Sequence, residues 1–162
     1  MTTAELPGSI SVEHIRGGAY RLTSTFALEQ PIDVVFPFFS DAFNLEKLTP
    51  PWLRFRVLTP APIRIERGTT IDYRLRIHGL PIRWTSEINV WEPPHRFADR
   101  QLRGPYRRWG HEHTFSENGE GTLVGDRVDF EVPGGRIPGR LASTDVRRIF
   151  AYRRKRLSEL FG

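Results

Sequence analysis

The sequence predicts an α+β fold in which seven antiparallel strands form one sheet against a long C-terminal helix, with two short helices after the first strand. Alternating apolar and polar residues recur in short segments separated by glycine and proline turns, which is typical of consecutive antiparallel strands. The last segment, residues 144–161, instead has apolar residues at helical spacing. Because 162 residues favour one domain, we expect a single domain over residues 1–162, with its core at about 20–161.

The first elements are expected between residues 1 and 48. Residues 1–18 end in a glycine pair and are expected to be a loose arm or a lead-in strand. Residues 20–28 alternate between apolar and polar and form the first predicted strand. Pro31 favours the start of a short helix, and residues 41–48 predict a second one.

Six more strands are expected to follow one another along the chain. They are separated by turn residues, of which Asn118-Gly119-Glu120-Gly121 is the clearest hairpin signal. Their expected ranges are 52–58, 69–78, 82–91, 96–103, 108–117 and 122–132. Such strands cannot cover both faces of a sheet by themselves, and the C-terminal amphipathic helix can cover one of them. This arrangement leaves space for a cavity between the sheet and the helix.

Composition narrows the classes of function. The chain has no cysteines, which excludes disulfides, thiolate metal sites and a cysteine nucleophile. No apolar run approaches the ~18 residues of a membrane span, and the first residues have no signal-peptide pattern, so we expect a cytoplasmic location. The net charge of +5 comes from arginines spread along the chain, and no nucleic-acid partner is expected. The glycines form no phosphate-binding pattern, and no G-x-S-x-G motif supports a serine hydrolase.

The stretch Phe97–Phe130 is the most informative part of the chain, because polar groups share its strand faces with large apolar residues. Its polar members are Asp99, Gln101, His111, His113 and Asp126. A purely structural core avoids such groups, since each needs a partner or water when buried. The face therefore suits the lining of a cavity. The aromatic residues expected to point inward with it are Tyr73, Trp84, Trp109, Phe115, Phe130 and Phe150.

The His111-x-His113 pair has three interpretations. Two histidines at i and i+2 on a strand share a face and can chelate a metal ion, with Asp99 or Asp126 as a third ligand. They can also form a hydrogen-bonded network that fixes the sheet register or orients a ligand. Alternatively, either histidine, with Asp99 behind it and Tyr73 as a donor, can serve as the base of a cyclase or dehydratase. We expect the network, and we assign no metal ion, no cofactor and no definite catalytic residue.

Two other features have both a structural and a functional interpretation. Gly104-Pro105-Tyr106 predicts a hairpin turn, from which Tyr106 can gate a cavity mouth. A basic run lies near the C-terminus, mostly off the apolar stripe of the predicted helix. It is either a solvated helix face or a surface that docks to an anionic membrane or a protein. Its members are Arg147, Arg148, Arg153, Arg154, Lys155 and Arg156.

Three motifs carry a resemblance to a known superfamily. They are W-E-P-P-H-R-F from Trp91, F-A-D-R-Q-L-R-G-P-Y-R-R-W-G-H-E-H-T-F from Phe97, and G-T-L-V-G-D-R-V-D-F-E-V-P-G-G from Gly121. With the order of elements over residues 20–161, they resemble the START-like (SRPBCC) superfamily and its helix-grip fold. Within it, they resemble an uncharacterised bacterial branch related to domains labelled cell-division inhibitor.

The resemblance implies a seven-stranded sheet wrapped around the C-terminal helix and a hydrophobic pocket. The superfamily includes lipid and sterol carriers, coenzyme Q-binding proteins and aromatic polyketide cyclases, so its fold does not settle function.

We therefore predict a carrier or sensor of a hydrophobic small molecule, such as a lipid, quinone or polyketide-like compound, in a cavity between the sheet and the C-terminal helix. One alternative is a polyketide cyclase/dehydratase-like enzyme with His111 or His113 as the acid–base group. Another is a protein-interaction module that uses the basic C-terminal helix. The expected ligand-binding residues are Tyr73, Trp84, Asp99, Gln101, Tyr106, Trp109, His111, His113, Phe115, Asp126 and Phe150.

Overall fold

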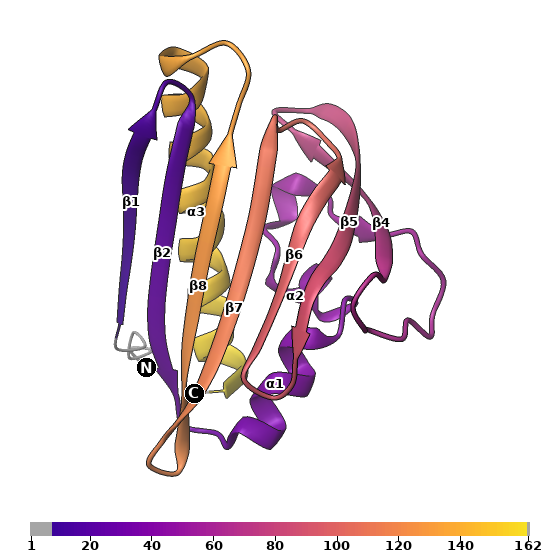
Figure 1. The fold of residues 1–162 in the computed structure, drawn as a ribbon, viewed down its shortest axis with the longest axis vertical. Helices are drawn as coiled ribbons and strands as arrows, with labels where there is room; N and C mark the ends of the chain where they lie inside the picture. Colours follow the sequence, from indigo (N-terminus) through magenta and orange to yellow (C-terminus); the bar gives the residue numbers. More distant parts are fainter. Residues whose placement is uncertain (1–7, 162) are drawn as a thin grey trace.

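A computed structural model describes residues 8–161, and one antiparallel sheet of eight strands dominates it, in the order β1-β2-β8-β7-β6-β5-β4-β3. Figure 1 shows the C-terminal helix α3 (Arg136–Phe161) lying against one face of the sheet, along β1, β2 and β8. The short helices lie behind the other half of the sheet. The strands are β1 Gly8–Arg16, β2 Ala19–Leu28, β3 Arg56–Val57, β4 Thr70–Ile77, β5 Leu80–Glu92, β6 Arg96–Arg103, β7 Arg108–Asn118 and β8 Gly121–Glu131.

The predicted α+β helix-grip class is confirmed, but the described sheet has eight strands and not seven. The additional strand is β1, which pairs with β2 from Gly8↔Phe26 to Arg16↔Ala19. Of the expected arm or lead-in strand, residues 8–16 thus form a strand, and residues 1–7 lie outside the described residues.

The strand expected at residues 52–58 is much shorter than predicted. A single 3₁₀ turn, η1, occupies Pro51–Leu53, and only Arg56 and Val57 pair with β4. Proline has a fixed φ and no N–H to donate, which favours a tight turn over a strand after Pro50. Arg54 then adopts a left-handed conformation with φ 46°, which breaks the extended chain.

Three helices accompany the sheet in the described part of the chain: α1 (Ile32–Ser40), α2 (Asn44–Leu48) and α3. Helix α3 begins at Arg136 and not at 144 as predicted. Ser143 and Thr144 lie inside this helix, where their hydroxyls donate to the Arg140 carbonyl. Within residues 8–161, none of these helices is both long and apolar enough to cross a membrane.

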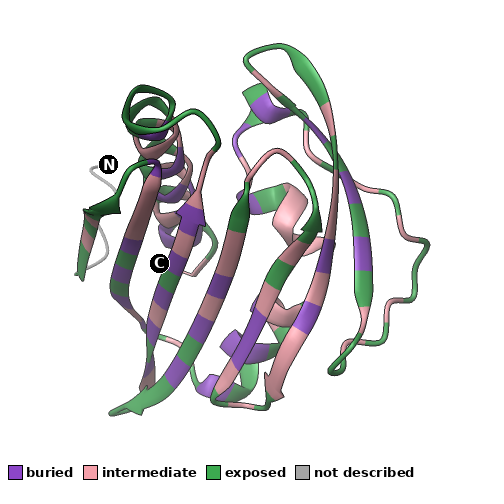
Figure 2. Cartoon of the chain, turned by 45° about the horizontal axis from the view of Figure 1, so that its top comes forward, coloured by how far each residue is buried: buried purple, intermediate pink, exposed green. Residues whose placement is uncertain are grey.

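The buried side chains form three separate clusters on the inner face of the sheet. One packs α1 against the sheet around Phe36 and Phe115, and a second packs α3 around Phe130 and Phe150. A third surrounds Tyr73 on β4. Figure 2 shows buried and exposed residues alternating along the central strands, as the period of a strand requires. The sheet thus sends every second side chain into the space that the helices enclose.

Leu22→Ala tests the packing of α3 on the sheet. Leu22 is completely buried in the second cluster and does not line the cavity described below, so its truncation leaves a void in the core. We expect the free energy of unfolding, measured by urea denaturation, to fall by about 2 to 5 kcal/mol. Leu123→Ala, at a β8 position that is 43% exposed, is the matched control and should change it by less than about 0.5 kcal/mol. Equal effects of the two changes would contradict this packing.

Candidate functional site

A cavity of about 600 Å³ lies between the inner face of the sheet, helix α3 and the segment from α1 to η1. Side chains from all three buried clusters line it, so the space lies where the clusters do not merge. Four of its lining residues are also exposed to solvent and mark its mouth: Trp52, His78, Gly79 and Arg148. The cavity is therefore mostly apolar inside and opens beside α3.

Eight of the eleven predicted ligand-binding residues line this cavity. They come from strands β4 to β7, the turn between β6 and β7, and helix α3: Tyr73, Trp84, Asp99, Tyr106, Trp109, His111, His113 and Phe150. Phe115 instead packs in the α1 cluster, and Asp126 lies buried behind the histidines. Tyr106, expected as a gate, packs against Trp84 and Trp109 with ring centroids 5.5 and 4.8 Å away and forms part of the wall.

Gln101 does not line the cavity but holds the turn between β6 and β7. Its side-chain amide donates to the Tyr106 carbonyl at 2.7 Å and accepts from the Tyr106 amide at 3.1 Å. A Cβ on Gly104 would lie 2.4 Å from Gln101 Oε1, so this glycine makes room for the side chain. Gln101 therefore positions Tyr106 in the wall and does not contact the space itself.

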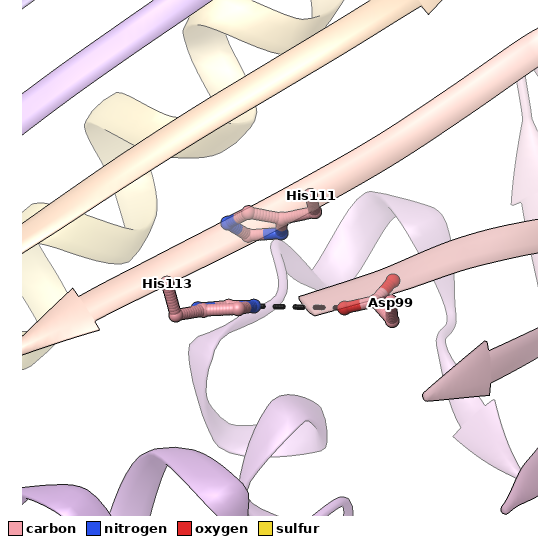
Figure 3. Close-up of side chains that lie close together, drawn as sticks. All are labelled: Asp99, His111 and His113. Carbon is pink, nitrogen blue, oxygen red and sulfur yellow. Dashed lines mark ion pairs between the residues drawn. The ribbon is translucent and has the colours of Figure 1, made fainter. Parts of the chain in front are cut away.

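The polar wall of the cavity is built on the centre of β7. In the backbone register His111 lies opposite Asp99 on β6, and His113 lies opposite Asp126 on β8. The rings of His111 and His113 stack with their centroids 3.7 Å apart, and Phe97 stacks on the other side of His113 at 4.2 Å. Figure 3 shows the imidazole of His111 above that of His113, and the Asp99 carboxylate at the end of the His113 ring.

The two carboxylates take different places around the histidines. Asp126 Oδ1 accepts a hydrogen bond from His111 Nε2 at 2.7 Å and lies 3.4 Å from His113 Nδ1. Asp99 Oδ2 lies 3.5 Å from His113 Nε2 and faces the cavity. Asp99 thus stands beside His113, whereas the carboxylate hydrogen-bonded to His111 is Asp126. Asp99 and the two imidazoles also form a group that could hold a metal ion.

Burial and charge set the protonation of this wall. Burial alone would raise the pKa of Asp126, but the hydrogen bond from His111 and the nearby positive charges lower it to about 2. Burial raises the pKa of Asp99 above its usual range, against the opposing charges of His111 and Arg153. Burial also lowers the pKa of His113 well below its usual range, and this imidazole is neutral at neutral pH.

Arg153 on α3 is a cavity residue that the sequence interpretation missed. Its side chain was expected on a solvated basic face, yet the residue is only 8% exposed and its guanidinium lies over the rings of Phe39 and Phe150. Arg153 follows Phe150 by three residues and precedes Leu157 by four, which places it on the apolar stripe of the helix. That spacing is the signal that identifies it. Its positive charge faces Asp99 and Asp126 from the opposite layer.

Other members of the basic run are engaged in contacts within the chain. Arg154 donates to the Gly8 carbonyl at 2.9 Å, and Arg156 donates to the Lys47 carbonyl at 3.2 Å. The guanidinium of Arg148 lies 5.3 Å from the centre of the Trp52 ring at the cavity mouth. The basic face of α3 therefore holds neighbouring elements in place as well as meeting solvent.

Two contacts join α3 to the opposite side of the mouth. His78, in the turn between β4 and β5, lies with Nε2 2.8 Å from Asp145 Oδ2 on the helix. Trp52 of η1 meets the ring of Tyr152 at 5.8 Å in an edge-to-face contact. Both contacts are made by side chains, so side chains and not paired backbone bound the mouth at these two points.

The sheet, the long helix and the enclosed apolar space define a helix-grip protein with the architecture of hydrophobic-ligand binders. A profile of the family described as "Polyketide cyclase / dehydrase and lipid transport" matches residues 28–154. The protein belongs to this family, and the predicted START-like resemblance is confirmed. A comparison with curated proteins gives no match.

Solved structures with this fold come from several bacteria. Protein Ms6760 from Mycobacterium smegmatis is 18% identical, with a TM-score of 0.68 over 95% of this chain and 97% of that one. The aromatase/cyclase Zhui from Streptomyces sp. R1128 is 17% identical, with a TM-score of 0.68 over 87% and 92% of the two chains. A START superfamily protein from Mycobacterium smegmatis is 13% identical, with a TM-score of 0.66 over 87% and 96%. At these identities the likeness shows the fold alone.

Gln101→Ala tests the support of the cavity wall. It removes both hydrogen bonds to Tyr106, so the free energy of unfolding should fall by about 1 to 3 kcal/mol. Hydrogen exchange of the Tyr106 amide should become faster at the same time. Arg103→Ala, two residues along the same strand and exposed, is the control and should leave that exchange rate unchanged. An unchanged Tyr106 amide in Gln101→Ala would show that the turn is held by other contacts.

Proposed function

We propose that this protein is a carrier or sensor that binds a hydrophobic small molecule, of the lipid, quinone or polyketide type, between the sheet and α3. The observation that carries the proposal is the cavity of about 600 Å³ with apolar walls and one polar side. Ligand pockets of about 300 to 1,000 Å³ bury most of a small molecule. Each Å² of apolar surface that leaves water then stabilises the complex by about 25 cal/mol.

The aromatic wall supplies the contact area for such a ligand. Trp84 and Trp109 meet edge to face, with ring centroids 5.2 Å apart, and Tyr106 closes the group. These rings are held by one another and by Gln101, so little side-chain entropy is lost when a ligand packs on them. A flat or extended apolar molecule fits this surface better than a highly polar one.

The polar wall orients the ligand. Asp99, His111 and His113 stand on the sheet side, and Arg153 stands on the helix side of the same cavity. A single carbonyl or hydroxyl group on an otherwise apolar molecule would meet donors and acceptors only at this end. A few polar groups in an apolar pocket determine which way round a ligand binds. The family description, which includes lipid transport, supports the same proposal.

A second candidate function is acid–base catalysis on a carbonyl compound, favoured by the His111–Asp126 pair. Asp126 accepts a hydrogen bond from the N–H at His111 Nε2, which leaves Nδ1 of this ring as the nitrogen that can take a proton. A carboxylate that orients an imidazole in this way is typical of a general base. Burial holds the pKa of Tyr73 above its usual range, so its hydroxyl stays protonated as a donor on the same cavity.

Native mass spectrometry of the freshly purified protein tests the carrier proposal. We expect a non-covalent guest that is lost on denaturation, and lower guest occupancy in Trp109→Ala because that change removes contact area from the wall. Trp91→Leu is the control, because Trp91 packs against Phe36 and Phe97 and does not line the cavity. The absence of a guest, together with no binding of added long-chain fatty acid or quinone, would overturn the proposal.

Hydrogen–deuterium exchange of a 1,3-diketone probe, followed by NMR, tests the catalytic candidate. A general base in the cavity would exchange the α-proton of the probe faster than buffer does. His111→Gln should reduce that acceleration by about 100-fold or more while the probe still binds. Asp126→Asn should also slow exchange, because it removes the carboxylate that orients His111. If the unmodified protein binds the probe without accelerating its exchange, the catalytic candidate is contradicted and the carrier proposal is unaffected.

A further inference from the structure

We propose that Asp99, His111 and His113 form a binding site for a divalent transition metal ion on the polar wall of the cavity. One possible ligand atom from each residue lies within 4.8 Å of the other two. Two imidazoles and one carboxylate form a donor set that suits zinc or iron, and three protein ligands leave a coordination position open. The site would be distinct from the apolar walls and needs no hydrophobic ligand.

The atoms that face the cavity are free to bind an ion. His111 Nε2 is occupied by Asp126, but its Nδ1 has no hydrogen-bond partner among residues 8–161. His113 Nε2 has only the Asp99 oxygen at 3.5 Å, and in the same described range the Asp99 carboxylate accepts no hydrogen bond. All three residues line the cavity, which provides a path for an ion to enter.

Asp126 supplies the support that metal-binding histidines usually have. Its Oδ1 lies 2.7 Å from His111 Nε2 and 3.4 Å from His113 Nδ1, on the side of both rings away from Asp99. The hydrogen bond to Asp126 keeps the proton on His111 Nε2 and leaves the lone pair of His111 Nδ1 for an ion. The same carboxylate stands beside His113 Nδ1 without a hydrogen bond, so one buried side chain orients His111 and lies close to His113. A merely structural pair of histidines does not require this arrangement.

The charges of the wall also favour a cation. Asp99 and Asp126 bring two carboxylates to the cluster, and Arg153 is the one guanidinium of the described chain that lines the cavity and is also buried. The two carboxylates of the cluster outnumber this one buried guanidinium. A bound metal ion would attract both carboxylates and would use lone pairs of Asp99 and His111 that no hydrogen bond takes.

The geometry needs only small adjustments to close around an ion. Bonds of about 2.1 Å at tetrahedral angles place ligand atoms about 3.4 Å apart. The present limit of 4.8 Å exceeds this by an amount that side-chain rotation can remove. No hydrogen bond fixes His113 Nδ1. His111 and Phe97 only stack on this ring, so it can turn in its own plane.

Titration of the untagged, chelator-treated protein with Zn²⁺, by calorimetry, tests the site. We expect one equivalent to bind with a dissociation constant of about 1 µM or lower, as for a site with three protein ligands. Co²⁺ should bind at the same stoichiometry and give the visible absorption bands that are typical of a site with a low coordination number. His113→Ala and Asp99→Asn should each weaken Zn²⁺ binding by about 100-fold, and Asp126→Asn by about 10- to 100-fold through loss of ring orientation.

His78→Ala is the matched control, because His78 also lies beside a carboxylate, 2.8 Å from Asp145, but on the exposed rim. It should leave the Zn²⁺ affinity unchanged. Asp99→Asn changes a residue that is not fully buried into one of the same shape, so it tests the site even if His113→Ala fails to fold. No binding, or binding that survives Asp99→Asn and is lost in His78→Ala, would overturn the proposal. Because the probe is the metal ion alone, neither result bears on the hydrophobic-ligand proposal, which native mass spectrometry tests separately.

Discussion

The pairing of β7 with β6 and β8 is the constraint on which the cavity and its polar wall both depend. The hairpin at Asn118 and Gly121 starts a register that places His113 opposite Asp126, and the β6 pairing places His111 opposite Asp99. A slip of one residue would turn every β7 side chain to the other face of the sheet. The histidines would then reach solvent, and Gly110 and Glu112 would face α3. The identity of the wall is therefore a property of backbone register.

A second layer of constraint comes from the buried charges. Asp126 is almost fully buried and hydrogen-bonded to His111. On the helix side, the guanidinium of Arg153 lies over the aromatic rings of Phe39 and Phe150. Buried ion networks contribute little net stability, but removing one partner is strongly destabilising because it leaves the other uncompensated. The attraction between Arg153 and the two carboxylates therefore acts across the cavity, without a direct hydrogen bond from its Nε or Nη2. These charges lie at the edge of a cavity, where a purely structural core would place apolar side chains.

Similarity of fold does not determine the chemistry of this site, which depends on the residues that line it. The solved relatives named above are 13 to 18% identical, and their shared feature is a sheet around a long helix. Such a fold supports many functions, which differ in the groups placed inside it. Here those groups are one aromatic wall and one wall of imidazoles and carboxylates that meet in the same space. Ligand binding, proton transfer and metal binding would all take place where these two walls meet. They differ in whether a ligand, a proton or a metal ion approaches His111 Nδ1 and His113 Nε2.

Local periodicity in the sequence determined much of the architecture. The alternation in β4, β7 and β8 identified strands and the faces that turn inward, because successive side chains on a strand point to opposite sides. It also placed His111 and His113 on one face, and the helical spacing near the C-terminus identified the body of α3. These features depend on residues close together in the chain.

Only the tertiary structure decided which distant groups meet. Residues 8–16 become a strand because the exposed edge of β2 is available to them, and periodicity alone did not require that pairing. Asp126 is hydrogen-bonded to His111 while Asp99 lies beside His113, because side-chain rotamers select among the neighbours that the register supplies and no alternation pattern specifies them. Arg153 points into the cavity because the carboxylates of Asp126 and Asp99, on the sheet opposite α3, attract its positive charge. Sequence patterns report which face a residue occupies, whereas the partner on that face depends on contacts between segments far apart in the chain.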